Sequence, residues 1–179
     1  MKEHIEQIAE PYREKLVQYR RHLHAHPELS FHETETSAWI KDRLSAAGID
    51  ILPGITGNSV VGVIDSGIPG PCIAFRADFD ALPIQEEVDV PYKSQVPNVM
   101  HACGHDAHTA ILLCLAEVFA ANRDLIQHGS VRFLFQQAEE VMPGGAFYLV
   151  KDGIMKDVDR IFGLHISNMY ETGTLACTA

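Results

Sequence analysis

The sequence is poor in basic residues and contains no long apolar run. It has 14 lysines and arginines against 24 aspartates and glutamates, a formal net charge of −10. A nucleic-acid-binding chain needs a basic face for the phosphates, so the charge excludes this class of partner. The longest apolar stretch, residues 109–121, contains Glu117 and is too short to span a bilayer. We therefore expect neither a nucleic acid nor a membrane as partner.

Cysteine is also scarce, and its spacing does not suggest a disulfide framework. The four cysteines, at positions 72, 103, 114 and 177, form no CxxC pair. Residues 1–16 carry charges where a secretory signal requires an apolar segment. We therefore predict a cytoplasmic protein with free thiols.

What the chain does contain is enough for one domain with a core: 179 residues, 46% hydrophobic and 21% charged. Periodicity and stop signals predict helices over about 12–25, from a capping box at 30–33 to Gly48, over about 105–121, and from 143 to about 153. Strands are predicted over 59–64, 71–77, 130–136 and 160–166, with one more beginning at Gly173. This alternation predicts an α/β fold, a layered sheet with helices on both faces.

Polar residues cluster where these strands end. They lie in four segments: 76–80, 101–106, 139–140 and position 165. In α/β sheets the chemistry gathers beyond the carboxyl ends of the strands, so parallel neighbouring strands would bring the four segments together. Each segment alone has a structural explanation. The occurrence of all four at strand ends favours a metal site instead.

Each segment offers a metal role and a structural one. Cys103 and His105 could bind one ion or two adjacent ions across Gly104, or form a buried cysteine beside a helix start. The Glu139–Glu140 pair needs a compensating positive charge if buried, and is otherwise a solvated acidic loop. Asp78 could orient a metal-bound histidine or belong to a turn. A strand-end histidine such as His165 is more often structural, and we interpret His108 as core-lining.

Five motifs, in order, resemble one family. The segment 100–108 (MHACGHDAH) resembles the signature of the M20 metallopeptidase group, in the branch of hippurate hydrolases, N-acyl-amino-acid amidohydrolases, plant auxin-conjugate hydrolases and N-acetyldiaminopimelate deacetylases. The other four are 21–29 (RHLHAHPEL), 76–83 (RADFDALP), 135–140 (FQQAEE, followed by GGA at 144–146) and 163–165 (GLH). The resemblance covers nearly the whole chain.

The resemblance implies a Zn-peptidase-like catalytic domain with two divalent ions, zinc or manganese, cobalt and nickel being further candidates. By residue, it implies Cys103, His105, Glu140 and His165 as metal ligands. Glu139 would be the general base, and Asp78, usually counted as catalytic, would support the site. The implied reaction is hydrolysis of the amide bond of an N-acyl amino acid or a similar small acyl conjugate.

Complete members of the group continue beyond this point and are homo-oligomeric. They have an inserted lid or dimerisation domain and a C-terminal catalytic segment with a further metal-binding histidine. We therefore interpret residues 1–179 as the N-terminal part of a catalytic domain, incomplete at its C-terminus, and expect little or no amidohydrolase activity from this chain alone. Two alternatives stay open: an inactive metal-binding remnant, and a thiol hydrolase with Cys103 as nucleophile and His105 or His108 as base.

Overall fold

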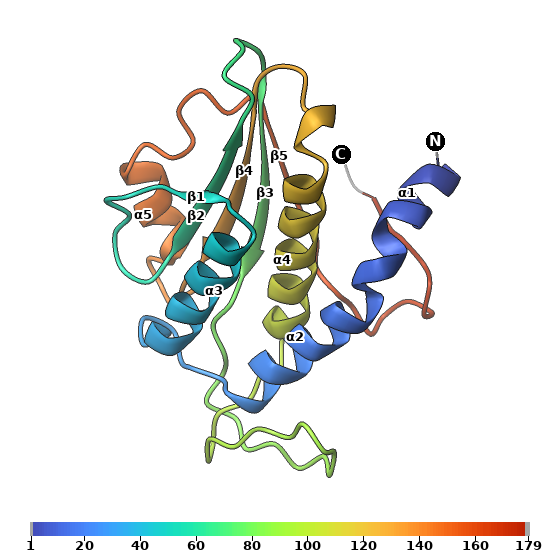
Figure 1. Ribbon diagram of the computed structural model, residues 1–179. Helices are drawn as coiled ribbons and strands as arrows, with labels where there is room; N and C mark the ends of the chain where they lie inside the picture. Colours follow the sequence, from blue (N-terminus) through green and yellow to red (C-terminus); the bar gives the residue numbers. More distant parts are fainter. Residues whose placement is uncertain (1, 178–179) are drawn as a thin grey trace.

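The computed structural model describes residues 2–177 and has a mixed sheet between two layers of helices (Figure 1). The helices are α1 (Lys2–Ala9), α2 (Arg13–Ala25), α3 (Thr34–Ala46), α4 (His105–Ala121) and α5 (Gly145–Lys151), with 3₁₀ turns η1 (Glu10–Tyr12) and η2 (Arg123–Leu125). The strands are β1 (Asp50–Ile51), β2 (Val60–Asp65), β3 (Cys72–Asp78), β4 (Ser130–Gln136) and β5 (Arg160–Gly163).

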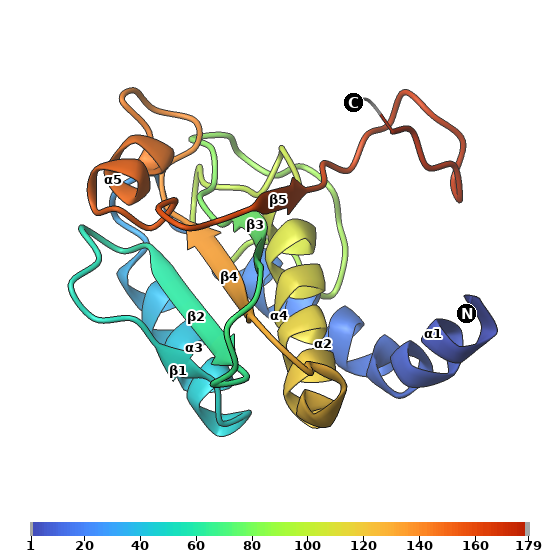
Figure 2. The ribbon, with the colours of Figure 1, turned by 90° about the horizontal axis from the view of Figure 1, so that it is seen from above.

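The strand order is β1-β2-β4-β3-β5. Strand β3 runs parallel to both β4 and β5, whereas β2 is antiparallel to β4, and β1 is antiparallel to β2. The three parallel strands therefore end at the same edge of the sheet, and α4 begins at that edge (Figures 1 and 2). This confirms the expectation that polar segments far apart in the sequence meet there.

The two faces of the sheet have separate cores. Alternate residues of β4, Val131, Phe133 and Phe135, pack with Leu44 of α3 and Leu113 of α4 on one face. On the other face Leu134 packs with Val61, Ala74, Leu149 of α5 and Ile154. Figure 2 shows α5 on the opposite side of the sheet from α4. Helices thus cover both faces, as the strand–helix alternation predicts.

The predicted capping box at Ser30–Glu33 is wrong. The Ser30 hydroxyl donates to Asp80 Oδ2 at 2.7 Å instead of to the helix. The Glu28 carboxylate accepts the N–H groups of residues 35 and 36 of α3, at 3.2 and 2.7 Å. Residues 30–33 match the capping-box pattern, but the chain turns at Phe31, whose φ is +67°, so Ser30 is directed away from the helix.

Other element boundaries also differ from the prediction. The strand predicted over 160–166 ends at Gly163, and α1 and β1 were not predicted. The strand expected to begin at Gly173 does not form over residues 173–177, and residues 178–179 lie outside the described part of the chain. Across the described residues, no helix is long and apolar enough to cross a membrane.

Candidate metal centre

Side chains from three separate segments meet at the carboxyl edge of the parallel strands. One ligand atom from each of Cys103, His105 and His165 lies within 4.8 Å of the others, and the same holds for His105, Glu139 and Glu140. His105 belongs to both groups, so its imidazole is the centre of the cluster. The structure thus brings together the four metal ligands that the family resemblance implies among residues 1–179, together with the implied base.

His105 presents one ring nitrogen to this cluster. Gly104, in a left-handed conformation at φ +87°, precedes His105 at the first position of α4. Nδ1 lies 3.0 Å from the carbonyl oxygen and 3.1 Å from Oδ1 of Asp80, so it carries the proton and donates to them. Nε2 is buried and has no hydrogen-bond partner. A buried nitrogen with a free lone pair is costly unless it binds something, and a metal ion satisfies it.

The carboxylate that orients His105 is Asp80, although the sequence suggested Asp78 for such a role. Asp80 Oδ2 also accepts the Ser30 hydroxyl at 2.7 Å and the backbone N–H of Glu140 at 3.0 Å. Burial opposes the charged form, but the hydrogen bonds from His105, Ser30 and this backbone hold the pKa of Asp80 well below its usual range. Asp80 thus joins the His105 ring to the Glu139–Glu140 segment.

Asp78 contacts His108 and Arg76 more closely than it approaches His105, since its Oδ1 lies 3.7 Å from His105 Nε2. Its Oδ1 accepts from His108 Nδ1 at 2.7 Å, and its Oδ2 pairs with Arg76 Nη1 at 2.7 Å. His108 Nε2 accepts the backbone N–H of Ile166 at 3.0 Å, so this ring has no nitrogen left for an ion. His108 is therefore more than core-lining: it links Asp78 to the segment that carries His165.

Cys103 and His165 belong to the segments before α4 and after β5; Cys103 is half-buried and His165 is exposed. Cys103 Sγ lies 3.4 Å from His165 Nε2, while His165 Nδ1 donates to the carbonyl of Ile166 at 2.6 Å. Burial, and then the neighbouring Glu140 carboxylate, raises the pKa of the Cys103 thiol to about 11. A thiol among carboxylates becomes a thiolate only when a cation compensates it, which fits a ligand better than a nucleophile.

The residues present fit divalent cations. The cluster combines thiol, imidazole and carboxylate donors, the set that zinc accepts and manganese partly shares. Burial disfavours the charged form of His105, but the Asp80 hydrogen bond and the Asp78 and Glu140 carboxylates outweigh it and raise the pKa of this histidine. The acidic surroundings thus favour positive charge at the cluster.

A buried polar network beside the cluster was missed by the sequence reasoning. His24 of α2 lies between Asp106, with Nδ1–Oδ2 at 2.6 Å, and Glu86, with Nε2–Oε1 at 3.0 Å. Arg20 Nε lies 2.9 Å from the same oxygen of Asp106. The nearby His101 ring is buried, and burial lowers its pKa to about 4. The segments 21–29 and 101–106 contain His24, His101 and Asp106, but nothing in the sequence joined the two segments.

The free energy of unfolding should depend on pH through His24. The Asp106 hydrogen bond, partly offset by burial, raises the pKa of His24 above its ordinary 6.5. The stabilisation is therefore present below pH 6.5 and lost as the pH rises through the raised value. In urea unfolding, wild type should exceed H24Q in stability at pH 6, and the margin should shrink by pH 9. A margin that does not change with pH would contradict this assignment.

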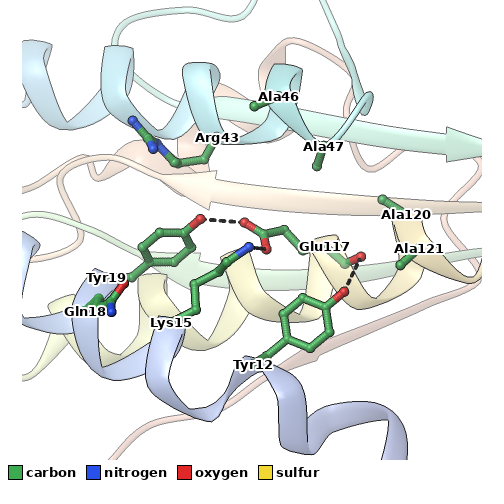
Figure 3. Close-up of a pocket in the computed structure, with 10 residues that line it drawn as sticks. All are labelled: Tyr12, Lys15, Gln18, Tyr19, Arg43, Ala46, Ala47, Glu117, Ala120 and Ala121. Carbon is green, nitrogen blue, oxygen red and sulfur yellow. Dashed lines mark hydrogen bonds and ion pairs between the residues drawn. The ribbon is translucent and has the colours of Figure 1, made fainter.

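A separate cavity of about 580 Å³ lies between α2, α3 and α4, toward the other end of α4 (Figure 3). Glu117 accepts the Tyr19 hydroxyl at 2.6 Å and pairs with Lys15 at 2.5 Å. The Tyr12 hydroxyl donates to the backbone carbonyl of Glu117 at 3.4 Å. Because these polar groups satisfy one another, we interpret them as a structural link between α2 and α4.

Comparisons with known proteins agree with this geometry. Residues 74–179 match the model of "Peptidase family M20/M25/M40". The chain is 45% identical over 174 residues to an N-acyl-L-amino acid amidohydrolase of Geobacillus stearothermophilus, covering 97% of this chain and 47% of that protein. It is 45% identical over 161 residues to an N-acetyl-L-cysteine deacetylase of Bacillus subtilis, covering 90% of this chain and 38% of that protein.

A solved structure shows the same fold. The Bacillus subtilis YXEP protein, described as a dinuclear metal binding peptidase from the M20 family, superposes with a TM-score of 0.82 at 42% identity. The match covers 88% of this chain and 44% of that one. The chain thus spans less than half the length of these three relatives.

Proposed function

Since the chain belongs to peptidase family M20/M25/M40, we propose that it carries the metal ligands and the general base of an amidohydrolase that acts on N-acyl amino acids. The observation that carries the proposal is the buried Nε2 of His105, which has no hydrogen-bond partner and faces a cluster of potential ligands. Residues 1–179 would form the N-terminal part of the catalytic domain. The lid or dimerisation domain and the C-terminal catalytic segment would lie outside these residues.

Cys103, His105, Glu140 and His165 would hold two divalent ions. The name of the Bacillus subtilis YXEP structure supports two metals in this family. The donors fit zinc, and manganese is the second candidate. Asp80 and Asp78 would support the site through His105 and His108, by fixing which ring nitrogen carries the proton.

The proposed reaction is amide hydrolysis, in which water adds to the acyl carbon and the C–N bond breaks to give a carboxylate and an amine. Bound divalent ions would polarise the amide carbonyl and lower the pKa of water. The Glu139 carboxylate would accept a proton from the attacking water and then donate it to the leaving nitrogen. Its exposed position at the cluster, next to the ligand Glu140, suits this exchange with substrate.

The relatives support the substrate class. Two of their names specify an N-acyl-L-amino acid and an N-acetyl-L-cysteine. These compounds share an acyl group joined to an amino acid by a linear amide. We therefore propose a small N-acyl amino acid as substrate, in a cytoplasmic setting.

Purified chain loaded with Zn²⁺ or Mn²⁺ should contain close to two ions per polypeptide by elemental analysis. A chelator should remove them, and re-addition should restore them, because the ligands are assembled in the fold. Folded chain with no bound metal would contradict the proposed ligand set. One ion per polypeptide would show that one of the two proposed sites does not form from these residues.

A thiol hydrolase is the second candidate, and the 3.4 Å separation of Cys103 Sγ and His165 Nε2 is the observation that favours it. The raised pKa of the Cys103 thiol opposes it. Hydrolysis that survives chelation but not thiol alkylation would establish this candidate. Metal binding without any hydrolysis would instead support a non-catalytic metal-binding remnant.

A further inference from the structure

We propose that Glu33, which precedes α3, is a positioning residue for the Glu139–Glu140 segment. This inference rests on the proposed function, since it assigns the proposed base and one proposed ligand a common support. Glu33 lies 105 residues before Ala138 in sequence, yet its Oε1 accepts the Ala138 backbone N–H at 2.7 Å. Glu33 and Ala138 side chains are both fully buried, with 0% of their surface exposed.

The Glu33 carboxylate is held by neutral donors. Besides Ala138, Asn58 Nδ2 donates to its Oε2 at 3.2 Å. Burial raises the pKa of Glu33, and the hydrogen bonds only partly offset this. Neutral donors compensate a buried carboxylate less well than a cation does. Burial of this carboxylate is unfavourable, so we infer that Glu33 has a role besides packing. That role is to hold the Ala138 backbone.

Ala138 has the backbone conformation that needs such support. Its φ is +46°, in the left-handed region that non-glycine residues rarely adopt. The carbonyl of Ala138 accepts the Gly145 N–H at 3.0 Å, so both backbone polar groups of this residue are fixed. The turn lies directly after β4 and directly before Glu139, and it therefore sets where both glutamates lie.

The neighbouring residue Gln137 is equally enclosed. Its N–H donates to Ser59 Oγ at 3.2 Å, and its side-chain oxygen accepts the Asn58 N–H at 2.5 Å. A side chain at Gly145 would overlap the Gln137 carbonyl, and one at Gly57 would overlap the Gln137 side chain. The turn therefore cannot shift toward these neighbours. Without an acceptor at position 33, the Ala138 N–H would be buried and unpaired, and the backbone would have to rotate to regain a partner.

The test compares E33A, E33D and E33Q with E35A, which removes an exposed glutamate from the first turn of the same helix. Zn²⁺ affinity is measured by competition with a chromophoric chelator, on protein shown to be folded by circular dichroism. We expect E33A to bind about 10–100-fold more weakly than wild type, the range for losing a residue that supports a ligand. E35A should bind as wild type does.

The two conservative variants separate position from charge. E33Q keeps the length and an acceptor oxygen for the Ala138 N–H, so it should restore most of the affinity. E33D keeps the charge, but it is one methylene shorter and should bind more weakly than E33Q. The Zn²⁺ affinities of E33Q and E33D can still be compared if E33A does not fold. Wild-type affinity in folded E33A, or E33D binding better than E33Q, would overturn the proposal.

A metal-independent measurement distinguishes this inference from the proposed function. In metal-free protein, amide hydrogen exchange at Ala138 and Glu140 should be slow in wild type and E35A, and faster in E33A. If wild type binds no Zn²⁺ but the exchange follows this pattern, the proposed function fails and the support of the turn stands. If exchange is unchanged in E33A, Glu33 does not hold the turn.

Discussion

Replacing His105 with alanine is expected to weaken Zn²⁺ binding by more than about 100-fold, since losing only a supporting partner of a ligand already costs about 10–100-fold. His105 is shared by all three groups of potential ligands, the third being Asp78, His105 and His108, so its removal should affect both proposed ions. Its Nε2 is buried without a hydrogen-bond partner, and Asp80 fixes the ring orientation. His108, the nearest alternative, has both nitrogens engaged.

The measurement is metal stoichiometry by elemental analysis together with chelator competition. H128A is the matched control, because His128 is exposed in the connection before β4. It should retain wild-type metal content. C103S provides a smaller change at the same cluster, replacing a soft donor with a hard one, and should weaken zinc more than manganese. Folded H105A that still binds two ions would rule out His105 as a ligand.

In protein that joins residues 1–179 to the proposed C-terminal catalytic segment, replacing Glu139 with glutamine is expected to lower hydrolysis of N-acyl amino acids by about 10²–10⁴-fold, the usual contribution of a general base. The amide has the shape of the carboxylate but cannot accept the proton. Because Glu139 is exposed and Glu140 supplies the proposed ligand, E139Q should keep two ions and wild-type stability. Rates are compared in metal-loaded protein, with matched metal content.

E140Q is the informative counterpart, since the two glutamates are adjacent and both exposed. It should lose metal as well as rate, whereas E139Q should lose rate alone. Equal rates in wild type and E139Q would refute the base assignment. If neither protein shows hydrolysis while wild type holds two ions, the chain is the non-catalytic metal-binding remnant.

The acidic pair shows how far sequence reasoning reaches. Glu139 and Glu140 were singled out because two carboxylates follow an apolar strand, and the structure places both beside His105. Adjacent residues of an extended strand point in different directions. The sequence pattern therefore does not predict that both glutamates reach the same cluster. The left-handed Ala138 turn brings them there, and alanine carries no signal for such a turn. The ligand and base roles themselves stay predictions.

The supporting residues were harder to predict. The sequence suggests Asp78 as the partner of a metal-bound histidine and indicates no role for Asp80. In the structure, Asp80 accepts the His105 Nδ1 hydrogen bond and Asp78 accepts that of His108 Nδ1. Both aspartates end the same strand segment, two residues apart, and both were compatible with the pattern. Only the position of β3 against the first turn of α4 decides which carboxylate reaches which ring.

The alternation of helices and strands, the segments that carry chemistry and the family resemblance could be predicted, because they depend on local periodicity and on motifs a few residues long. Three features depend on tertiary contacts: which nitrogen of His105 faces the cluster, which aspartate orients it, and that Glu33 holds the turn before Glu139. Those contacts join residues 25 and 105 positions apart. Hydrogen bonds depend on distances of a few tenths of an ångström, which only the packing of α3 and α4 against the sheet establishes.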